Sequence, residues 1–207
     1  MMFRAALLGA FVAVALLQCT NVWACADSAA CLREIGEAQK QIRSLSARFV
    51  QTKHLALLEE PIESKGTFAF KHPDQVLWRI DDPAFEIRID GSKIQLPPGE
   101  DAGIRAMPPG LESLLGAMSA VFSGDIEAAS RRFDMEGKQE GGDVVIRMAP
   151  KEAADRRLLG NLRLTFARPE LTLRAIHLEE AVGDSVDIVF SDMHRNDGAA
   201  EAVLGQP

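Results

Sequence analysis

The sequence lacks tyrosine, is poor in histidine and cysteine, and carries none of the short motifs that mark common catalytic sites. Its 207 residues include four histidines, three cysteines, two tryptophans and no tyrosine. There is no Gly-x-Ser-x-Gly elbow, no P-loop and no His-Glu-x-x-His pair. The histidines lie far apart and share no metal-ligand spacing: His54, His72, His177 and His194. We therefore expect no catalytic residues, no metal site and no cofactor, and we interpret the chain as a protein that is not an enzyme.

Two local patterns could be taken for chemistry. Asp192 and His194 could in principle share a metal, and Gly183-Asp184-Ser185 is similar to a hydrolase start motif. The first pair equally suits the surface at a strand end, and the second lies late in the chain between two expected strands. We interpret them as surface groups and as a hairpin turn, respectively.

Basic charge is also scarce. The chain has 23 Lys and Arg against 30 Asp and Glu, a net charge of −7, and contains no basic run. Such a chain is a poor partner for nucleic acid or for an anionic membrane surface. Hydrophobic residues make up 47% of the sequence, which is typical of a globular protein and not of a disordered one. We expect a single domain and a monomer.

The one long apolar run lies at the N-terminus. Arg4 precedes apolar residues 5–17, and small residues stand at the −3 and −1 positions of cuts after Ala24 or Ala26. The run is shorter than the roughly 20 apolar residues that span a bilayer. The pattern therefore predicts a signal peptide over residues 1–24, export from the cytoplasm, and one domain over residues 27–207. A retained anchor and a buried N-terminal helix are the alternatives.

The cysteines leave three arrangements open. Cys19 would be lost with the signal peptide. A cut after Ala24 keeps Cys25 and Cys31, which could close a small disulfide in an oxidising compartment. A cut two residues later keeps Cys31 alone. A lipid on Cys25 is the third arrangement, although the bulky Trp23 makes a poor lipobox.

Hydrophobic spacing predicts two helices. Residues 29–54 place apolar side chains at mostly three- and four-residue steps, with charged residues on the other side. Residues 111–122 repeat this spacing, but their remaining side consists of small residues and one glutamate. A helix of such low polarity is expected to be covered or to dock on an apolar surface. The tail from Arg195 onward is polar or small and is expected to be loose.

Elsewhere apolar residues recur at every second position, which is typical of half-buried strands. A first group of four strands with tight turns predicts an antiparallel meander, with apolar positions Phe68 and Phe70; Val76, Trp78 and Ile80; Phe85, Ile87 and Ile89; and Ile94 and Leu96. A second group is expected near 133–138, 144–148, 162–166, 171–173, 176–178 and 186–190. About nine or ten strands, each with one apolar face, predict a large curved antiparallel sheet, mainly β with helices (α+β) over its open mouth.

A dry, curved interior could hold a lipid. Each buried methylene contributes about 0.8 kcal/mol, so an acyl chain of about sixteen carbons would gain at most roughly 13 kcal/mol. A movable lid would compete with the ligand for the same surface and so permit release. The alternative is that the apolar faces fill an ordinary core, and periodicity alone does not separate the two.

Several motifs follow one another in order along the chain. The first half carries Phe49-Val50-Gln51, Gly66-Thr67-Phe68-Ala69-Phe70-Lys71-His72-Pro73, Leu77-Trp78-Arg79 and Asp90-Gly91. The second half carries Phe122-Ser123-Gly124-Asp125, Met148-Ala149-Pro150-Lys151, Gly183-Asp184, Val189-Phe190-Ser191 and Asn196. This order and spacing resembles the LolA family, periplasmic carriers of outer-membrane lipoproteins. The resemblance implies an incomplete, strongly curved antiparallel β-barrel with an α-helical lid. It also implies transfer from an inner-membrane exporter to an outer-membrane acceptor.

The resemblance further implies where acyl chains of lipoproteins or other lipids would bind. We expect the cavity and lid to be lined by Phe49, Phe68, Phe70, Trp78, Ile80, Phe85, Ile87, Ile89, Leu114, Leu115, Met118 and Phe122. The sequence departs from the family at His72, where the resemblance implies an arginine that latches the lid. An imidazole offers at most two donors and titrates near neutrality, whereas a guanidinium offers five donors and a permanent charge. The latch is therefore weaker, or works differently, or is shared with Arg79.

Two other segments favour an alternative cargo. Gln51-Thr52-Lys53 and Glu60-Pro61-Ile62 are more similar to a LolA-like branch associated with the export of pigment-type lipids or glycolipids. A carrier for a non-protein lipid, such as a polyene or glycolipid, is therefore the first alternative function. A membrane-tethered lipid acceptor, held by a lipid on Cys25, is the second.

Overall fold

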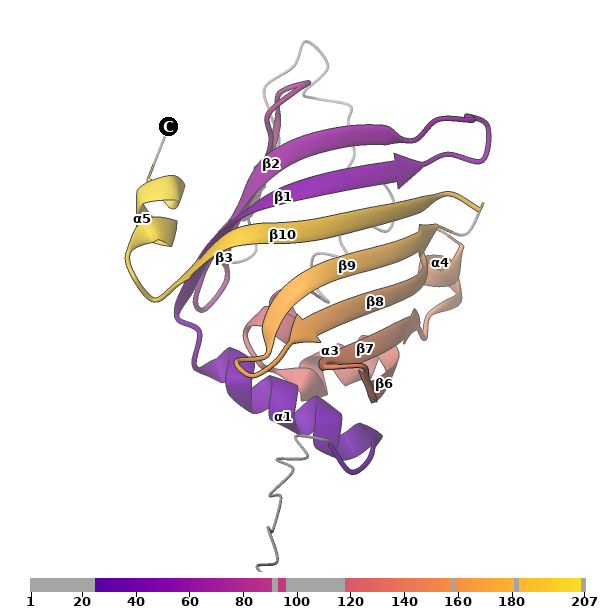
Figure 1. The fold of residues 1–207 in the computed structure, drawn as a ribbon, viewed down its shortest axis with the longest axis vertical. Coiled ribbons are helices and arrows are strands. Elements are labelled where there is room, and N and C mark those ends of the chain that lie inside the picture. Colours follow the sequence, from indigo (N-terminus) through magenta and orange to yellow (C-terminus); the bar gives the residue numbers. More distant parts are fainter. Residues whose placement is uncertain (1–24, 91–92, 96–117, 158, 181–182, 206–207) are drawn as a thin grey trace, which may run out of the picture.

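The computed structural model describes residues 25–90, 93–95, 118–157, 159–180 and 183–205. Its strands are β1 (Ser44–His54), β2 (Ile62–Lys71), β3 (Gln75–Ile80), β4 (Phe85–Asp90), β5 (Lys93–Gln95), β6 (Phe133–Glu140), β7 (Asp143–Pro150), β8 (Leu159–Ala167), β9 (Thr172–Glu180) and β10 (Ser185–Arg195). Its helices are α1 (Ser28–Lys40), α3 (Ile126–Arg132), α4 (Ala153–Arg156) and α5 (Ala199–Leu204), and residues 118–122 are also helical. The strands form one sheet in the order β5-β4-β3-β2-β1-β10-β9-β8-β7-β6 (Figure 1).

The sheet consists of two meanders that meet at its two longest strands. β1 and β10 have 11 residues each and pair antiparallel from Leu45 with Arg195 to His54 with Ser185. In the described part of the chain, β5 and β6 stand at opposite ends of the strand order, so the curved sheet stays open (Figure 1). The predicted incomplete antiparallel barrel is therefore confirmed.

The register joins the apolar positions of neighbouring strands into one surface. Phe68 lies opposite Trp78, Trp78 lies opposite Ile87, and Phe49 lies opposite Phe190. Directly opposed residues point to the same side of a sheet. We call this side the apolar face; in the second meander it continues through Ile188, Ile176, Leu164 and Ile146. The opposite side of the sheet is called the polar face.

Helices α1 and α3 pack at the β6 end of the sheet (Figure 1). The side chains of Asp27 and Asp125 cap them, each accepting a hydrogen bond from a backbone N–H in the first turn. Gly137 of β6 lets α1 approach closely, because a Cβ at this position would lie 2.7 Å from the Cβ of Cys31. The predicted strand near 133–138 is thus an edge strand covered by a helix, which protects an otherwise open sheet edge.

The predicted helix over residues 29–54 is wrong after α1, because the chain turns and continues as β1. Leu45 and Phe49 satisfy the four-residue step of a helix. Together with Ala47 they also satisfy the two-residue step of a strand, and all three side chains are buried. Pairing on both sides, with β2 and β10, decides in favour of the strand.

A side chain from the far end of the sequence fixes this turn. The amide oxygen of Asn196 accepts hydrogen bonds from the N–H groups of Arg43 at 2.7 Å and Ser44 at 3.0 Å. Its amide nitrogen donates to the carbonyl of Gln41 at 2.9 Å. A contact between residues so distant in sequence leaves no trace in local periodicity.

The predicted loose tail is also wrong. Residues 199–204 form α5, and Ala200 is buried against Ala69 and Leu77 on the polar face of β2 and β3. A small residue such as alanine permits this close approach without producing a strong apolar pattern in the sequence.

The sequence places two short apolar groups next to each other, on odd positions in residues 171–173 and on even positions in residues 176–178. The first group leads into β9 and the second lies within it. Thr165 lies opposite Ala175 whereas Phe166 lies opposite Leu173, so Arg174 is an extra residue. A β-bulge of this kind moves the apolar positions from odd to even numbers within one strand.

Cys25 and Cys31 form a disulfide at the start of α1. A sulfur in a disulfide is not free to carry a lipid. The signal peptide, its cleavage site and the start of the domain at residue 27 stay predictions, because residues 1–24 lie outside the described part. None of the described helices has the length and hydropathy needed to cross a membrane.

Candidate functional site

Four aromatic rings from four strands meet at the centre of the apolar face. Phe49 of β1 lies 4.3 Å from Trp78 of β3 between ring centroids, and Phe190 of β10 lies 6.3 Å from both of them. Phe68 of β2 lies 5.9 Å from Trp78 and 5.8 Å from Phe190. Such separations suit tilted and edge-to-face aromatic contacts. We call these four residues the aromatic cluster.

The helical residues 118–122 cover this cluster. The ring of Phe122 lies 5.1 Å from Phe68 and 5.8 Å from Phe70, and Met118 and Val121 are buried beside it. The predicted helix over 111–122 is thus helical where it is described, and its earlier residues lie outside the described part. The apolar face is therefore covered by a short segment that is not itself part of the sheet.

Gly66 makes room for the aromatic cluster. It stands opposite Phe49 in the sheet register. A Cβ at Gly66 would collide with the Phe49 ring and with the carbonyl oxygen of Arg79. The absent side chain lets the Phe49 ring lie over the backbone of β2 and reach Trp78 on the next strand.

The apolar face is sealed at its centre and more open toward β4. Phe49, Phe68 and Phe70 are almost completely buried, whereas Trp78 and Phe85 are only half-buried. Toward the turn between β1 and β2 the surface ends in a polar pair. The Nζ of Lys53 lies 3.4 Å from a carboxylate oxygen of Glu180. The apolar face is thus bounded by charge at this end.

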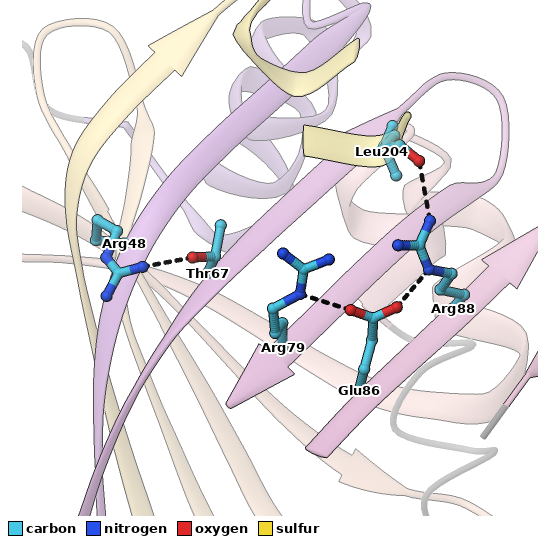
Figure 2. A network of polar contacts seen from close by, with 6 residues as sticks. All are labelled: Arg48, Thr67, Arg79, Glu86, Arg88 and Leu204. Atoms are coloured by element: carbon cyan, nitrogen blue, oxygen red, sulfur yellow. Dashed lines mark hydrogen bonds and ion pairs between the residues drawn. The ribbon is translucent and has the colours of Figure 1, made fainter. Parts of the chain in front are cut away.

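The polar face of the same strands carries ion pairs. Glu86 accepts hydrogen bonds from Arg79, at 2.5 Å, and from Arg88, and Arg88 donates to the carbonyl of Leu204 in α5 at 2.9 Å (Figure 2). Burial alone would raise the pKa of Glu86, but the hydrogen bonds and charges of Arg88 and Arg79 hold this pKa below its usual value. The network ties α5 to the outside of β4.

Arg79 therefore points away from the apolar face, because successive residues of a strand point to opposite sides and Trp78 belongs to the aromatic cluster. His72 is exposed in the turn after β2, where its backbone N–H donates to the carbonyl of Arg43 at 2.8 Å. The position of Arg79 gives no support to a contact with residues 118–122. The latch stays a prediction.

The structure brings together most of the residues expected to bind acyl chains. Those on the apolar face of β1 to β4 are Phe49, Phe68, Phe70, Trp78, Ile80, Phe85, Ile87 and Ile89. Met118 and Phe122 lie in the segment that covers them, and Leu114 and Leu115 lie outside the described residues. The position of these side chains agrees with the expectation, and their binding role stays a prediction.

Sequence reasoning missed Phe190 as a member of the site. Its alternation with Val186 and Ile188 marks it as an inward residue of a strand. Only the pairing of β10 with β1 brings it to Phe49, Phe68 and Trp78. The missing information was therefore the order of the strands in the sheet.

Hollows on the polar face have a different chemical character. One of about 530 Å³ is lined by Arg147, Arg163, Asn161, Glu136 and His177, among others. Another, of about 390 Å³, lies beside the end of α5. These charged linings do not suit an acyl chain. Within the described ranges, no group of three or more His, Cys, Asp or Glu residues is arranged to hold a metal.

Comparison with known proteins identifies relatives over most of the chain. Residues 40–203 match the family described as "Outer membrane lipoprotein carrier protein LolA". A protein named outer-membrane lipoprotein carrier protein from Pseudomonas syringae pv. tomato is 27% identical over 161 residues, which cover 76% of this chain and 74% of that protein. A protein of the same name from Azotobacter vinelandii is 26% identical over 168 residues, 80% of this chain and 78% of that one. The crystal structure of a LolA superfamily protein from Nitrosomonas europaea aligns with a TM-score of 0.45 at 12% identity, covering 85% of this chain and 98% of that chain.

Proposed function

Because the chain belongs to the LolA family of outer membrane lipoprotein carrier proteins, we propose that it is a periplasmic carrier that binds acyl chains on its apolar face. In this proposal it takes lipoproteins from an exporter in the inner membrane to an acceptor at the outer membrane. The Cys25–Cys31 disulfide supports an exported protein, since disulfides persist in oxidising compartments such as the periplasm. The signal peptide expected over residues 1–24 would direct this export.

The covered apolar face is the observation that carries the proposal. Burial of an acyl chain of about sixteen carbons is worth at most roughly 13 kcal/mol. A carrier with so large a binding energy would not release its cargo. Phe122 and Met118 occupy part of the same surface, and exposing each of them would cost roughly 1.5–3 kcal/mol. Their displacement therefore offsets part of the binding energy and favours release.

No catalytic group is needed for this activity. Loading and unloading change only which apolar groups cover the aromatic cluster, so no covalent bond forms or breaks. The protein works by competition between its own residues 118–122 and the acyl chain, and the direction of transfer comes from the membrane partners that supply and remove the cargo.

Mass spectrometry of the protein purified from the periplasm tests the proposal. We expect an acylated lipoprotein to accompany the unaltered chain and to be lost from Trp78→Asp, which places a charge in the aromatic cluster. Val189→Asp is the matched control, because Val189 is 54% exposed and lies on the polar face. Circular dichroism would confirm that both variants are folded. A protein that carries no lipid and binds no acyl probe would contradict the proposal.

A non-protein lipid is the alternative cargo, and His72 is the observation that favours it. This exposed imidazole stands where the resemblance implies an arginine latch. A weaker latch would suit a cargo that lacks a protein part and needs less enclosure. The same spectra decide between the two, because a polyene or glycolipid and an acylated cysteine differ in mass and fragmentation.

A further inference from the structure

The turn between β1 and β2 and the start of β2 expose three large apolar side chains. Leu57 is 97% exposed, Leu58 52% and Ile62 48%. We call residues 55–62 the β1–β2 tip. Isolated exposed leucines are common on protein surfaces, but three large apolar side chains within six residues form a patch. This patch is separate from the aromatic cluster, because none of its three residues belongs to the hydrophobic core.

The backbone of the tip is held in place, so the exposure of its leucines is built into the fold. The N–H of Leu58 donates to the carbonyl of Leu55 at 2.9 Å, which closes the turn. The N–H of Ala56 donates to the carboxylate of Asp184 at 2.8 Å, which ties the tip to the neighbouring turn between β9 and β10. A turn fixed at two points presents Leu57 with little further loss of conformational entropy on binding.

On the side of β3 and β4, the tip extends past the end of the neighbouring strand. β3 ends at Ile80 opposite Gly66, and the N–H of Asp81 makes the last bond in this direction, to the carbonyl of Lys65. The hairpin of β1 and β2 continues beyond this point (Figure 1). A partner could therefore approach the tip from this side without meeting β3 or β4.

Two acidic residues lie between the exposed leucines and Ile62. Glu59 and Glu60 follow the leucines directly, and among the described residues neither lies within ion-pair distance of a cation. Glu63 is 3.8 Å from Lys65 and is therefore neutralised locally. The uncompensated charge repels an anionic membrane surface and repels a second copy of the same tip. It is attracted to lysine or arginine.

We propose that the β1–β2 tip is a docking site for a protein partner that presents an apolar pocket bordered by lysine or arginine. Leu57 and Leu58 would fill the pocket, and Glu59 and Glu60 would pair with its basic border. Apolar anchors surrounded by complementary charge are the usual arrangement of a specific protein interface. The negative charge of Glu59 and Glu60 would speed association and select against wrong partners.

Photo-crosslinking in the native cell envelope tests this site. A crosslinking amino acid replaces Ile62 within the tip, or Val189 on the polar face as the matched control. We expect one discrete protein adduct from position 62 and not from position 189. The adduct yield should fall by about tenfold or more in Leu57→Ser/Leu58→Ser. It should also fall in Glu59→Lys/Glu60→Lys and at high ionic strength.

The partner identified by mass spectrometry is then purified, and its affinity is measured by calorimetry. The same two double variants should weaken binding, Val189→Ser should not, and reversing the charge of the partner's basic border should restore binding to Glu59→Lys/Glu60→Lys. An adduct with phospholipid, an adduct with a second copy of the chain, insensitivity to charge reversal, or no adduct at all would overturn the proposal.

Discussion

Trp78 and Arg79 are neighbours in β3, yet they belong to two surfaces with different physics. Trp78 contacts three other rings on the apolar face, whereas Arg79 pairs with Glu86 on the polar face. The first surface is stabilised by burial of large rings, which contributes several kcal/mol per side chain. The second is stabilised by partly exposed ion pairs, which contribute about 1 kcal/mol or less. Substitutions on the two faces should therefore differ in size and in their dependence on pH.

The largest effect is expected at the centre of the apolar face. Phe68 is 1% exposed and contacts Trp78, Phe122 and Phe190. Phe68→Ala should lower the free energy of unfolding by about 3–5 kcal/mol, because it removes a buried ring and leaves a cavity. Denaturant titration followed by circular dichroism would measure this. Val189→Ala on the polar face should change stability by no more than about 0.5 kcal/mol. Equal losses from the two variants would remove the distinction between the faces.

A smaller loss of stability is expected at Gly66, where the Phe49 ring lies over the backbone of β2. Gly66→Ala should lower the free energy of unfolding by about 1–3 kcal/mol, because the new methyl group collides with the carbonyl oxygen of Arg79 and with the Phe49 ring. It should also change the emission of Trp78, which packs on Phe49. Gly142→Ala is the control, since a Cβ there meets nothing within 4 Å. An unchanged stability in Gly66→Ala would show that the Phe49 ring and the backbone at Arg79 can both move aside without loss.

The smallest effect is expected on the polar face and should depend on pH. The pKa of Glu86 is lowered in the folded protein by Arg88 and Arg79 against the effect of burial. A carboxyl group with a depressed folded pKa stabilises the fold above its unfolded pKa and loses this contribution as pH falls through the folded value. Glu86→Gln should therefore cost about 0.5–1 kcal/mol at neutral pH, because solvent partly screens the pairs.

The same variant should lose this difference from the unaltered protein in acid, and thermal unfolding across a pH series would show it. Glu127→Gln should have no comparable effect at any pH, because Glu127 forms an exposed pair with Arg131 on α3. A loss in Glu86→Gln that stays constant down to low pH would mean that its charge is not the cause.

The alternation of residues along β2 to β4 predicted both faces correctly, because each strand repeats one apolar and one polar side. The sequence did not predict the change from helix α1 to strand β1. Leu45 and Phe49 fit both the helical and the strand spacing, and pairing of β1 with β2 and β10 determines which structure forms. The contacts of Asn196 and Ala200 were missed for a related reason. Each joins segments more than 100 residues apart, so local sequence does not encode them. Phe190 joins the aromatic cluster through strand order alone.

The most direct test of acyl-chain binding on the apolar face uses the fluorescence of Trp78. The chain has two tryptophans, Trp23 and Trp78, so a protein that begins at Cys25 retains Trp78 alone, inside the aromatic cluster. We predict that fatty acids brominated along the chain quench its emission in a saturable manner. Trp78→Phe/Val189→Trp, which moves the reporter to the polar face, should not be quenched. Equal quenching at both positions, or none at Trp78, would contradict binding on the apolar face.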